Sequence, residues 1–294
     1  MSATPMSPTA DTAAPAGGKS VGRRTPPRLA AAGLTLAYDA RVVVRNLDLE
    51  LPTGQVTVVV GANGCGKSTL LRGLGRLLKP ADGVVTLDGT DLRSLPTRRV
   101  AARLGVLPQQ PLAPEGITVS DLVSRGRHPH HGLLQRWGRA DDEAVAEALE
   151  RTGVADLALR RVDELSGGQR QRVWIAMMLA QDPEILLLDE PTTYLDVAHQ
   201  VEVLDLLAEL NRRQGTTVVM VLHDLHLAAR YADHLVVMTA GRITQQGPPQ
   251  EVLTREVMRE AFALDAVVVA DPVTGTPLVL PGTQHQRQRS APSA

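Results

Sequence analysis

The sequence is organised around Gly61-Ala62-Asn63-Gly64-Cys65-Gly66-Lys67-Ser68-Thr69, which fits the pattern G-x-x-x-x-G-K-[ST]. The β-branched run at residues 55–60 predicts a buried strand before this stretch, and the leucine spacing of residues 70–74 predicts a helix after it. The glycines therefore fall at a strand-to-helix turn, where positive φ and close approach of backbone N–H groups to an anion are useful. We expect a phosphate-binding loop in an α/β fold.

The lysine of this loop is unusual for the chain. Only three lysines, Lys19, Lys67 and Lys79, stand among its 31 basic residues. A bulky planar guanidinium would not replace the compact ammonium in such a loop. We expect Lys67 to reach the β- and γ-phosphates of ATP and Ser68 to ligate Mg²⁺. The alternative is a glycine-rich turn with a surface lysine, and the rarity of lysine in the rest of the chain disfavours it.

Composition and charge argue against some classes of protein. The chain has 294 residues, of which 43% are hydrophobic and 2% aromatic, so it can bury an aliphatic core. The formal net charge of −1 provides no global basic field, which argues against a nucleic-acid partner. A single cysteine excludes an internal disulfide framework and suits a reducing compartment.

The chain ends differ in composition from the middle. Residues 1–27 are rich in Pro, Ala, Ser, Thr and Gly and predict a disordered leader, and residues 282–294 predict a disordered tail. Arg23-Arg24 could mimic a twin-arginine signal, but two prolines intervene before the apolar residues that follow. The longest apolar run, Val173 to Ala180, is too short to span a membrane, so we expect the chain to be soluble by itself.

Residues 28–281 are predicted to form one ATPase domain. Strand and helix patterns alternate as in a parallel α/β sheet, and residues 46–51 alternate apolar and polar side chains as in a half-exposed antiparallel strand. Residues 113–165 break this alternation and offer helices instead, with a capping pattern at residues 118–121. We therefore predict a helical subdomain inserted at about 113–165.

Two carboxylates, Asp189 and Glu190, follow the buried aliphatic run at residues 185–188. The carboxyl end of a strand is where α/β sheets bind ligands. We expect Asp189 to hold Mg²⁺ and Glu190 to act as general base toward the water that attacks the γ-phosphate. An acidic strand end that merely faces solvent is the alternative.

A second anion site is predicted at Ser166, Gly167, Gly168 and Gln169, where unhindered amides open a helix. Because the chain already has one phosphate cradle, the second is best explained by a nucleotide bound to another copy. His223 directly follows a strand predicted at 217–222 and is placed to hydrogen-bond a γ-phosphate oxygen. A lone histidine is more often structural, but its position at a strand end favours a functional role.

With these motifs in order, the sequence resembles the ATP-binding-cassette (ABC) ATPases over roughly residues 29–281. The resemblance implies a P-loop NTPase core of ABC type, with an antiparallel β subdomain and an inserted helical subdomain. It further implies that Tyr38 stacks on adenine and that Asp196 lies across a homodimer seam. Gln109 would touch Mg²⁺ or the attacking water and couple the site to a membrane partner, although the adjacent Gln110 leaves a one-residue ambiguity.

A closer resemblance is to the ATP-binding subunits of ferric-siderophore importers. It is carried by the segments at residues 125–130, 191–200 and 271–277. It implies an ATPase subunit that powers uptake of an iron-siderophore complex through a separate membrane permease, fed indirectly by a substrate-binding protein. Such a subunit is peripheral to the cytoplasmic face of the cell membrane. Importers of vitamin B12 or haem look similar and stay open as alternatives, as do an exporter and a soluble ABC ATPase acting in DNA repair or translation.

Two further residue groups carry side chains capable of chemistry. Three histidines at residues 128–131 could suggest a metal site, but no carboxylate or cysteine shares their spacing, and a loop that meets the permease is the better interpretation. Cys65 lies beside Lys67 and near a helix N-terminus, both of which favour a reactive thiolate. The alternative is that Cys65 merely fills a permissive position and is shielded.

Overall fold

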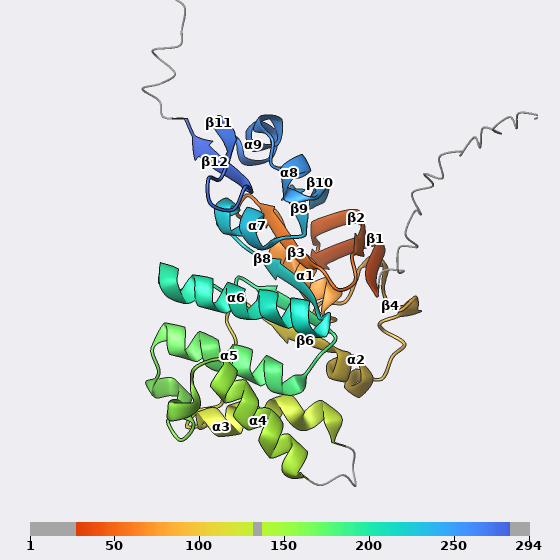
Figure 1. The fold of residues 1–294 in the computed structure, drawn as a ribbon. Helices are drawn as coiled ribbons and strands as arrows, with labels where there is room; N and C mark the ends of the chain where they lie inside the picture. Colours follow the sequence, from red (N-terminus) through yellow and green to blue (C-terminus); the bar gives the residue numbers. More distant parts are fainter. Residues whose placement is uncertain (1–27, 132–136, 283–294) are drawn as a thin grey trace, which may run out of the picture.

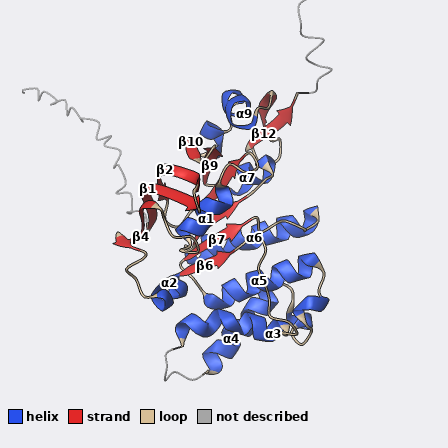
Figure 2. Cartoon of the chain, turned by 180° about the vertical axis from the view of Figure 1, so that it is seen from behind, coloured by secondary structure: helices blue, strands red, loops and turns tan. Residues whose placement is uncertain are grey.

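The computed structural model describes residues 28–131 and 137–282. The predicted leader, and the predicted tail apart from Gly282, lie outside the described residues. Two sheets lie beside each other and a layer of helices lies below the larger sheet (Figure 1). This arrangement, seen from behind in Figure 2, confirms the predicted α/β fold with an antiparallel part and a helical insertion.

The larger sheet carries the phosphate-binding loop. Its strand order is β10-β9-β3-β8-β7-β6, and all neighbours are parallel except β10, which pairs antiparallel with β9. Every residue of β7 and β8 is buried, as expected for strands covered on both faces. The strands are β3 (Val56–Gly61), β6 (Leu104–Leu107), β7 (Ile185–Asp189), β8 (Thr217–Val221), β9 (His234–Thr239) and β10 (Arg242–Gly247).

The smaller sheet is antiparallel in the order β2-β1-β4-β5. The predicted alternation at residues 46–51 is confirmed, because its leucines are buried while Asp48 and Glu50 are exposed. Helix α1 shares a buried cluster with both sheets, which includes Leu36 of β1 and Val59 of β3. The elements of this part are β1 (Leu29–Tyr38), β2 (Arg41–Leu51), α1 (Lys67–Leu74), β4 (Asp82–Leu87), β5 (Thr90–Asp91) and α2 (Thr97–Arg103).

The described residues between β6 and β7 form helices, turns and one isolated bridge. The predicted cap at Thr118 is present, since its hydroxyl accepts a hydrogen bond from Asp121 N (3.1 Å). Gly153, with φ of 62°, follows the helix at residues 139–151 and has the left-handed conformation common just after a helix end. The helices are α3 (Val119–Ser124), η1 (Arg125–His130), α4 (Arg139–Arg151), η2 (Ala155–Leu157), η3 (Val162–Glu164) and α5 (Gly167–Gln181).

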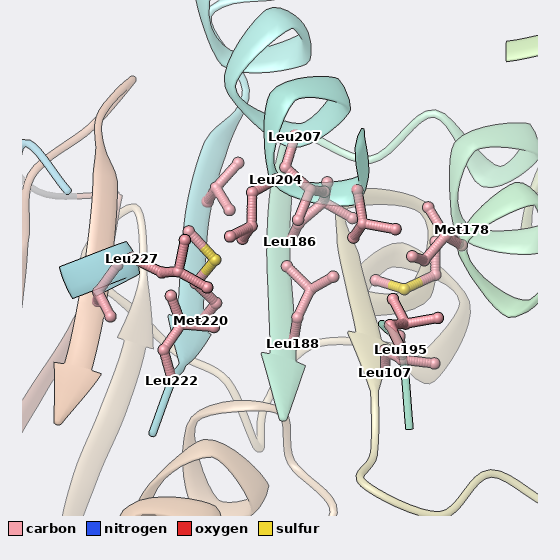
Figure 3. Packing of buried hydrophobic residues seen from close by; sticks show 14 of the residues in the cluster. Leu107, Met178, Leu186, Leu188, Leu195, Leu204, Leu207, Met220, Leu222 and Leu227 are labelled. Atoms are coloured by element: carbon pink, nitrogen blue, oxygen red, sulfur yellow. The ribbon is translucent and has the colours of Figure 1, made fainter. Parts of the chain in front are cut away.

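Helix α6 (Val197–Gln214) covers one face of the larger sheet. It begins after the N-cap Asp196 and ends at Gly215, where φ is 69°. Figure 3 shows Leu204 and Leu207 of α6 against Leu186 of β7. Full burial of such leucines contributes about 1.5–3 kcal/mol each. This packing fixes the direction in which β7 delivers the residues at its carboxyl end.

The C-terminal part completes the fold. The segment at residues 271–277 forms the turn of a hairpin, in which Asp271 Oδ1 accepts hydrogen bonds from the amides of Val273 and Thr274 (2.7 and 2.9 Å). Among the described residues, none of the helices has the length and apolar character needed to cross a membrane. The elements are α7 (Leu225–Tyr231), α8 (Pro249–Val252), α9 (Arg255–Phe262), β11 (Ala266–Ala270) and β12 (Pro277–Pro281).

Candidate functional site

The loop between β3 and α1 has the backbone that its glycines predict. Gly61, Gly64 and Gly66 have φ of 152°, 75° and 110°, the left-handed half of conformational space that favours glycine. A Cβ at Gly61 would lie only 2.2 Å from Met238 O, so no larger residue fits without moving β9. Gly66 then serves as the N-cap of α1, whose first amides face the loop.

A second loop braces the phosphate loop from outside. Gly241, in the turn between β9 and β10, donates its N–H to Cys65 O (2.9 Å) and accepts from Arg45 N at its carbonyl oxygen (3.0 Å). A Cβ at Gly241 would lie 2.0 Å from Val43 O. The antiparallel sheet and the phosphate loop are therefore joined through one glycine.

Lys67 is the buried cation of the site, with 5% of its surface exposed. Its Nζ donates hydrogen bonds to Gly61 O (2.9 Å) and Ala62 O (3.1 Å). The ammonium thus lies across the mouth of the loop, at the start of the helix, where an anion would be stabilised by both the charge and the helix N-terminus.

A pocket of about 370 Å³ opens over the loop. It brings together parts of the chain that the sequence predicted separately: the phosphate loop, Gln109 from the end of β6, Glu190 from the end of β7 and His223 from the end of β8. Val43 of β2 also lines it and was not predicted. The remaining lining residues are Asn63, Gly64, Gly66, Lys67, Ser68 and Thr69.

Asp189 and Ser68 form the part of the site suited to a divalent cation. Ser68 Oγ donates to Asp189 Oδ1 (2.8 Å), and Asp189 Oδ2 is buried without a hydrogen-bond partner among the described residues. Burial raises the pKa of Asp189 above its ordinary value, and the charge of Glu190 adds to this despite the hydrogen bond from Ser68. A hard cation would be favoured here, because it supplies the missing partner and stabilises the charged carboxylate.

Glu190 lies at the centre of a hydrogen-bonded group. It is 8% exposed and has φ of 55°, an uncommon conformation for a residue with a side chain. Gln109 Nε2 and Thr193 Oγ1 donate to its Oε2 (2.7 and 3.1 Å), and His223 Nε2 lies 2.5 Å from its Oε1. Burial alone would raise the pKa of Glu190, but these hydrogen bonds outweigh it and hold the pKa below its usual value.

Gln109 and the adjacent Gln110 differ in position. The side chain of Gln109 lines the pocket and reaches Glu190, whereas Gln110 is exposed and does not line the pocket. Thr193, like Val43, is a residue near this site to which no role was assigned from the sequence. Its position three residues after Glu190, in a turn before a helix, is the only signal that could have suggested it.

The second predicted anion site lies apart from this pocket. Ser166 caps α5 reciprocally with Gln169: Ser166 Oγ accepts from Gln169 N (3.2 Å) and Gln169 Oε1 accepts from Ser166 N (3.1 Å). Neither residue lines the pocket of the same chain, nor do Gly167 and Gly168. Ser166 and Gly167 are exposed. Their amides are thus presented at the surface, at the N-terminus of a long helix.

Two other predicted residues also lie outside the pocket lining. Tyr38, at the end of β1, is 39% exposed and accepts a hydrogen bond from Arg72 Nη1 of α1 (3.1 Å). Asp196 caps α6 and its Oδ1 lies 2.7 Å from His199 Nδ1. Both side chains lie at the surface beside elements of the site and are open to groups from outside the chain.

The expectation of a reactive thiolate at Cys65 is wrong. Cys65 is 7% exposed, and its Sγ lies 2.9 Å from where a Cβ at Gly61 would be. Burial raises the pKa of the Cys65 thiol above its ordinary value, and the nearby charge of Lys67 only partly opposes this. The physical reason is that the side chain points into the core below the loop and not toward the phosphates.

Alkylation of native Cys65 by a charged maleimide should therefore be slow at neutral pH, because the thiol is both buried and protonated. The rate should be measured by mass spectrometry on the native and the denatured chain, with Cys65→Ser as the blank. Since the chain has one cysteine, all labelling reports on this position. Native labelling as fast as that of the denatured chain would contradict the shielded geometry.

Comparison with known proteins agrees with this site. The model of the ABC transporter family matches residues 44–193. The achromobactin transport ATP-binding protein CbrD of Dickeya dadantii (strain 3937) is 54% identical over 258 residues, which cover 88% of this chain and 96% of that protein. The ferric enterobactin transport ATP-binding protein FepC of Escherichia coli (strain K12) is 51% identical over 254 residues, covering 86% and 94%.

A solved structure supplies the corresponding fold. The dimeric structure of a post-hydrolysis state of the ATP-binding cassette MJ0796, bound to ADP and Pi, matches with a TM-score of 0.67 and 28% identity, covering 75% of this chain and 98% of that chain. The chain therefore belongs to the ABC transporter family, in which it is an ATP-binding cassette with ATPase activity.

Proposed function

We propose that this chain is the ATP-hydrolysing subunit of an importer for an iron-siderophore complex. The observation that carries the proposal is the single pocket in which the phosphate loop, Gln109, Glu190 and His223 meet, with the Ser68–Asp189 pair at its side. The similarity to achromobactin and ferric enterobactin transport proteins supports the choice of cargo.

The proposed roles follow from position and charge. Lys67 and the amides of residues 61–69 hold the phosphates, and Tyr38 stacks on the adenine. Glu190 accepts the proton of a water whose oxygen attacks the γ-phosphorus, and the bond to the bridging oxygen breaks with its electron pair left on ADP. His223 hydrogen-bonds a γ-phosphate oxygen. Each group lies at a strand end or helix start, where the fold holds it rigidly.

Ser68, Asp189 and Gln109 would hold Mg²⁺. The unpartnered Asp189 Oδ2 and the hydroxyl of Ser68 fit a cation that prefers oxygen ligands. The positive charge that Mg²⁺ supplies when bound would offset the negative charge of the phosphates. The chain's own contribution is to orient these oxygens beside the loop.

The exposed residues at the start of α5 support a homodimer. Ser166, Gly167, Gly168 and Gln169 would face the γ-phosphate held by Lys67 of a second copy, and Asp196 would lie at the seam between the copies. This arrangement explains why amides at a helix N-terminus are presented at the surface away from the chain's own pocket.

A separate membrane permease is the proposed partner, with a substrate-binding protein acting indirectly through it. The helical subdomain at about 113–165, together with Gln109, is available for docking to that permease. The chain would then be peripheral to the cytoplasmic face of the cell membrane. No nucleic-acid partner is proposed, in keeping with the net charge of −1.

Cells whose only copy carries Glu190→Gln should fail to accumulate radiolabelled iron from a siderophore, because transport needs hydrolysis. Uptake of free ferrous iron by the same cells should be unchanged and serves as the control. Retained chelate uptake with loss of labelled cobalamin or haem uptake would assign the cargo to the alternatives. If none of these is affected, a soluble ABC ATPase becomes the better description.

A further inference from the structure

The turn after β7 closes on Glu190 through one residue, Thr193. Thr193 N donates to Glu190 O (3.2 Å), and Thr193 Oγ1 donates to Glu190 Oε2 (3.1 Å). The backbone and the side chain of the same residue therefore bind the backbone and the side chain of the glutamate. Such a double contact fixes both the direction of the Cα–Cβ bond and the orientation of the carboxylate.

Glu190 needs such a restraint. Its φ of 55° is unfavourable for a residue with a side chain and persists only where neighbouring contacts enforce it. With 8% of its surface exposed, the carboxylate also has little water to satisfy its oxygens. The hydroxyl of Thr193 supplies a hydrogen bond from within the same turn, so it moves with Glu190.

The other two side chains that contact the Glu190 carboxylate do not belong to the same turn as Glu190. Gln109 and His223 come from the ends of β6 and β8, and both line the pocket over the phosphate loop. Their proposed roles at the cation and the γ-phosphate would draw them away from the carboxylate. Thr193 does not line that pocket; it lies on the adjacent cavity of about 150 Å³ behind Glu190.

We propose that Thr193 is a positioning residue that holds the Glu190 carboxylate toward the attacking water after Gln109 and His223 have turned to the nucleotide. The proposal rests on the proposed role of Glu190 as general base. It assigns to a turn residue the task of keeping one carboxylate oxygen bonded while the other faces the water.

Thr193→Val keeps the β-branched shape and removes the hydroxyl. We expect kcat for ATP to fall about 10-fold, the loss typical of one hydrogen bond to a charged group. KM, and the equilibrium binding of a non-hydrolysable ATP analogue, should stay unchanged because Thr193 lies outside the pocket lining. Thr193→Ser, which keeps the donor, should restore kcat.

Thr192→Val is the matched control. It makes the same change one residue earlier, at a side chain for which no hydrogen bond to Glu190 is found in the described part of the chain. It should leave kcat near that of the unmodified chain. Melting temperatures of all variants should be recorded, and a loss of kcat in Thr193→Val that Ser does not rescue, or that comes with raised KM, would overturn the positioning role.

A double substitution separates this inference from the proposed function. If Thr193 acts through Glu190, adding Thr193→Val to Glu190→Ala should cause no further loss in single-turnover hydrolysis. A further 10-fold loss would overturn the inference while leaving Glu190 as the base. Near-normal turnover of Glu190→Gln itself would instead remove the base assignment on which the inference rests.

Discussion

Glu190→Gln should bind MgATP with unchanged affinity and hydrolyse it about 10²- to 10⁴-fold more slowly, the usual contribution of a positioned general base. The amide has the same shape as the carboxylate and can still accept hydrogen bonds from Gln109 and Thr193 at its carbonyl oxygen. It cannot take a proton from water at neutral pH. The substitution therefore removes the proton acceptor and keeps the shape of the side chain.

Steady-state phosphate release and equilibrium nucleotide binding measure the two halves of this prediction. Glu143→Gln is a suitable control, because it makes the same change on an exposed part of α4, where Glu143 pairs with Arg139 at the surface. Turnover close to normal in Glu190→Gln would show that another group, with His223 first in line, removes the proton.

Chains with Lys67→Ala and chains with Ser166→Arg should each lose ATP hydrolysis when alone and regain part of it when mixed. Lys67→Ala should weaken ATP binding about 10²-fold, since it deletes the buried cation that we propose contacts the phosphates. Ser166→Arg should leave ATP binding to the single chain intact but abolish hydrolysis, because a guanidinium replaces the small side chain that we propose faces the γ-phosphate bound by the partner. Mixed together, the two chains should form at most one competent site per heterodimer.

The recovery is measured as ATPase activity of the mixture against each variant alone at the same total concentration. Lys79→Ala, at an exposed lysine, controls for loss of a positive charge. An ATP-dependent dimer of Glu190→Gln chains should appear in sedimentation. Only monomer at high protein and saturating ATP, with and without the permease, would contradict a composite site.

Much of the site could be predicted because its determinants are local in the chain. The phosphate loop depends on glycine spacing between a strand and a helix, and Asp189 and Glu190 depend on where an aliphatic run stops. Contacts between residues that lie far apart in the sequence could not be predicted in the same way. The burial of Cys65 follows from the approach of β9 to Gly61, far along the chain, which no spacing reveals.

The start of α5 shows how a weak local preference is overridden. Glycine disfavours helices, yet α5 begins at Gly167 and includes Gly168 in its first turn. The reciprocal hydrogen bonds between Ser166 and Gln169 satisfy the first amides and compensate for the two glycines. The contact of Thr193 with Glu190 could not be predicted from the hydroxyl alone, because it also depends on the path of the turn after β7.

The brace at Gly241 limits where this protein can be labelled. Hairpin turns ordinarily accept inserted tags, because few contacts cross them. An epitope or fluorophore inserted at the β9–β10 turn would instead displace the amide that holds Cys65 O and disturb the nucleotide loop. The β11–β12 turn offers the better position, since a Cβ at Gly275 would meet nothing within 4 Å. A reporter placed there would follow the assembly and turnover of the transporter without disturbing the phosphate-binding loop.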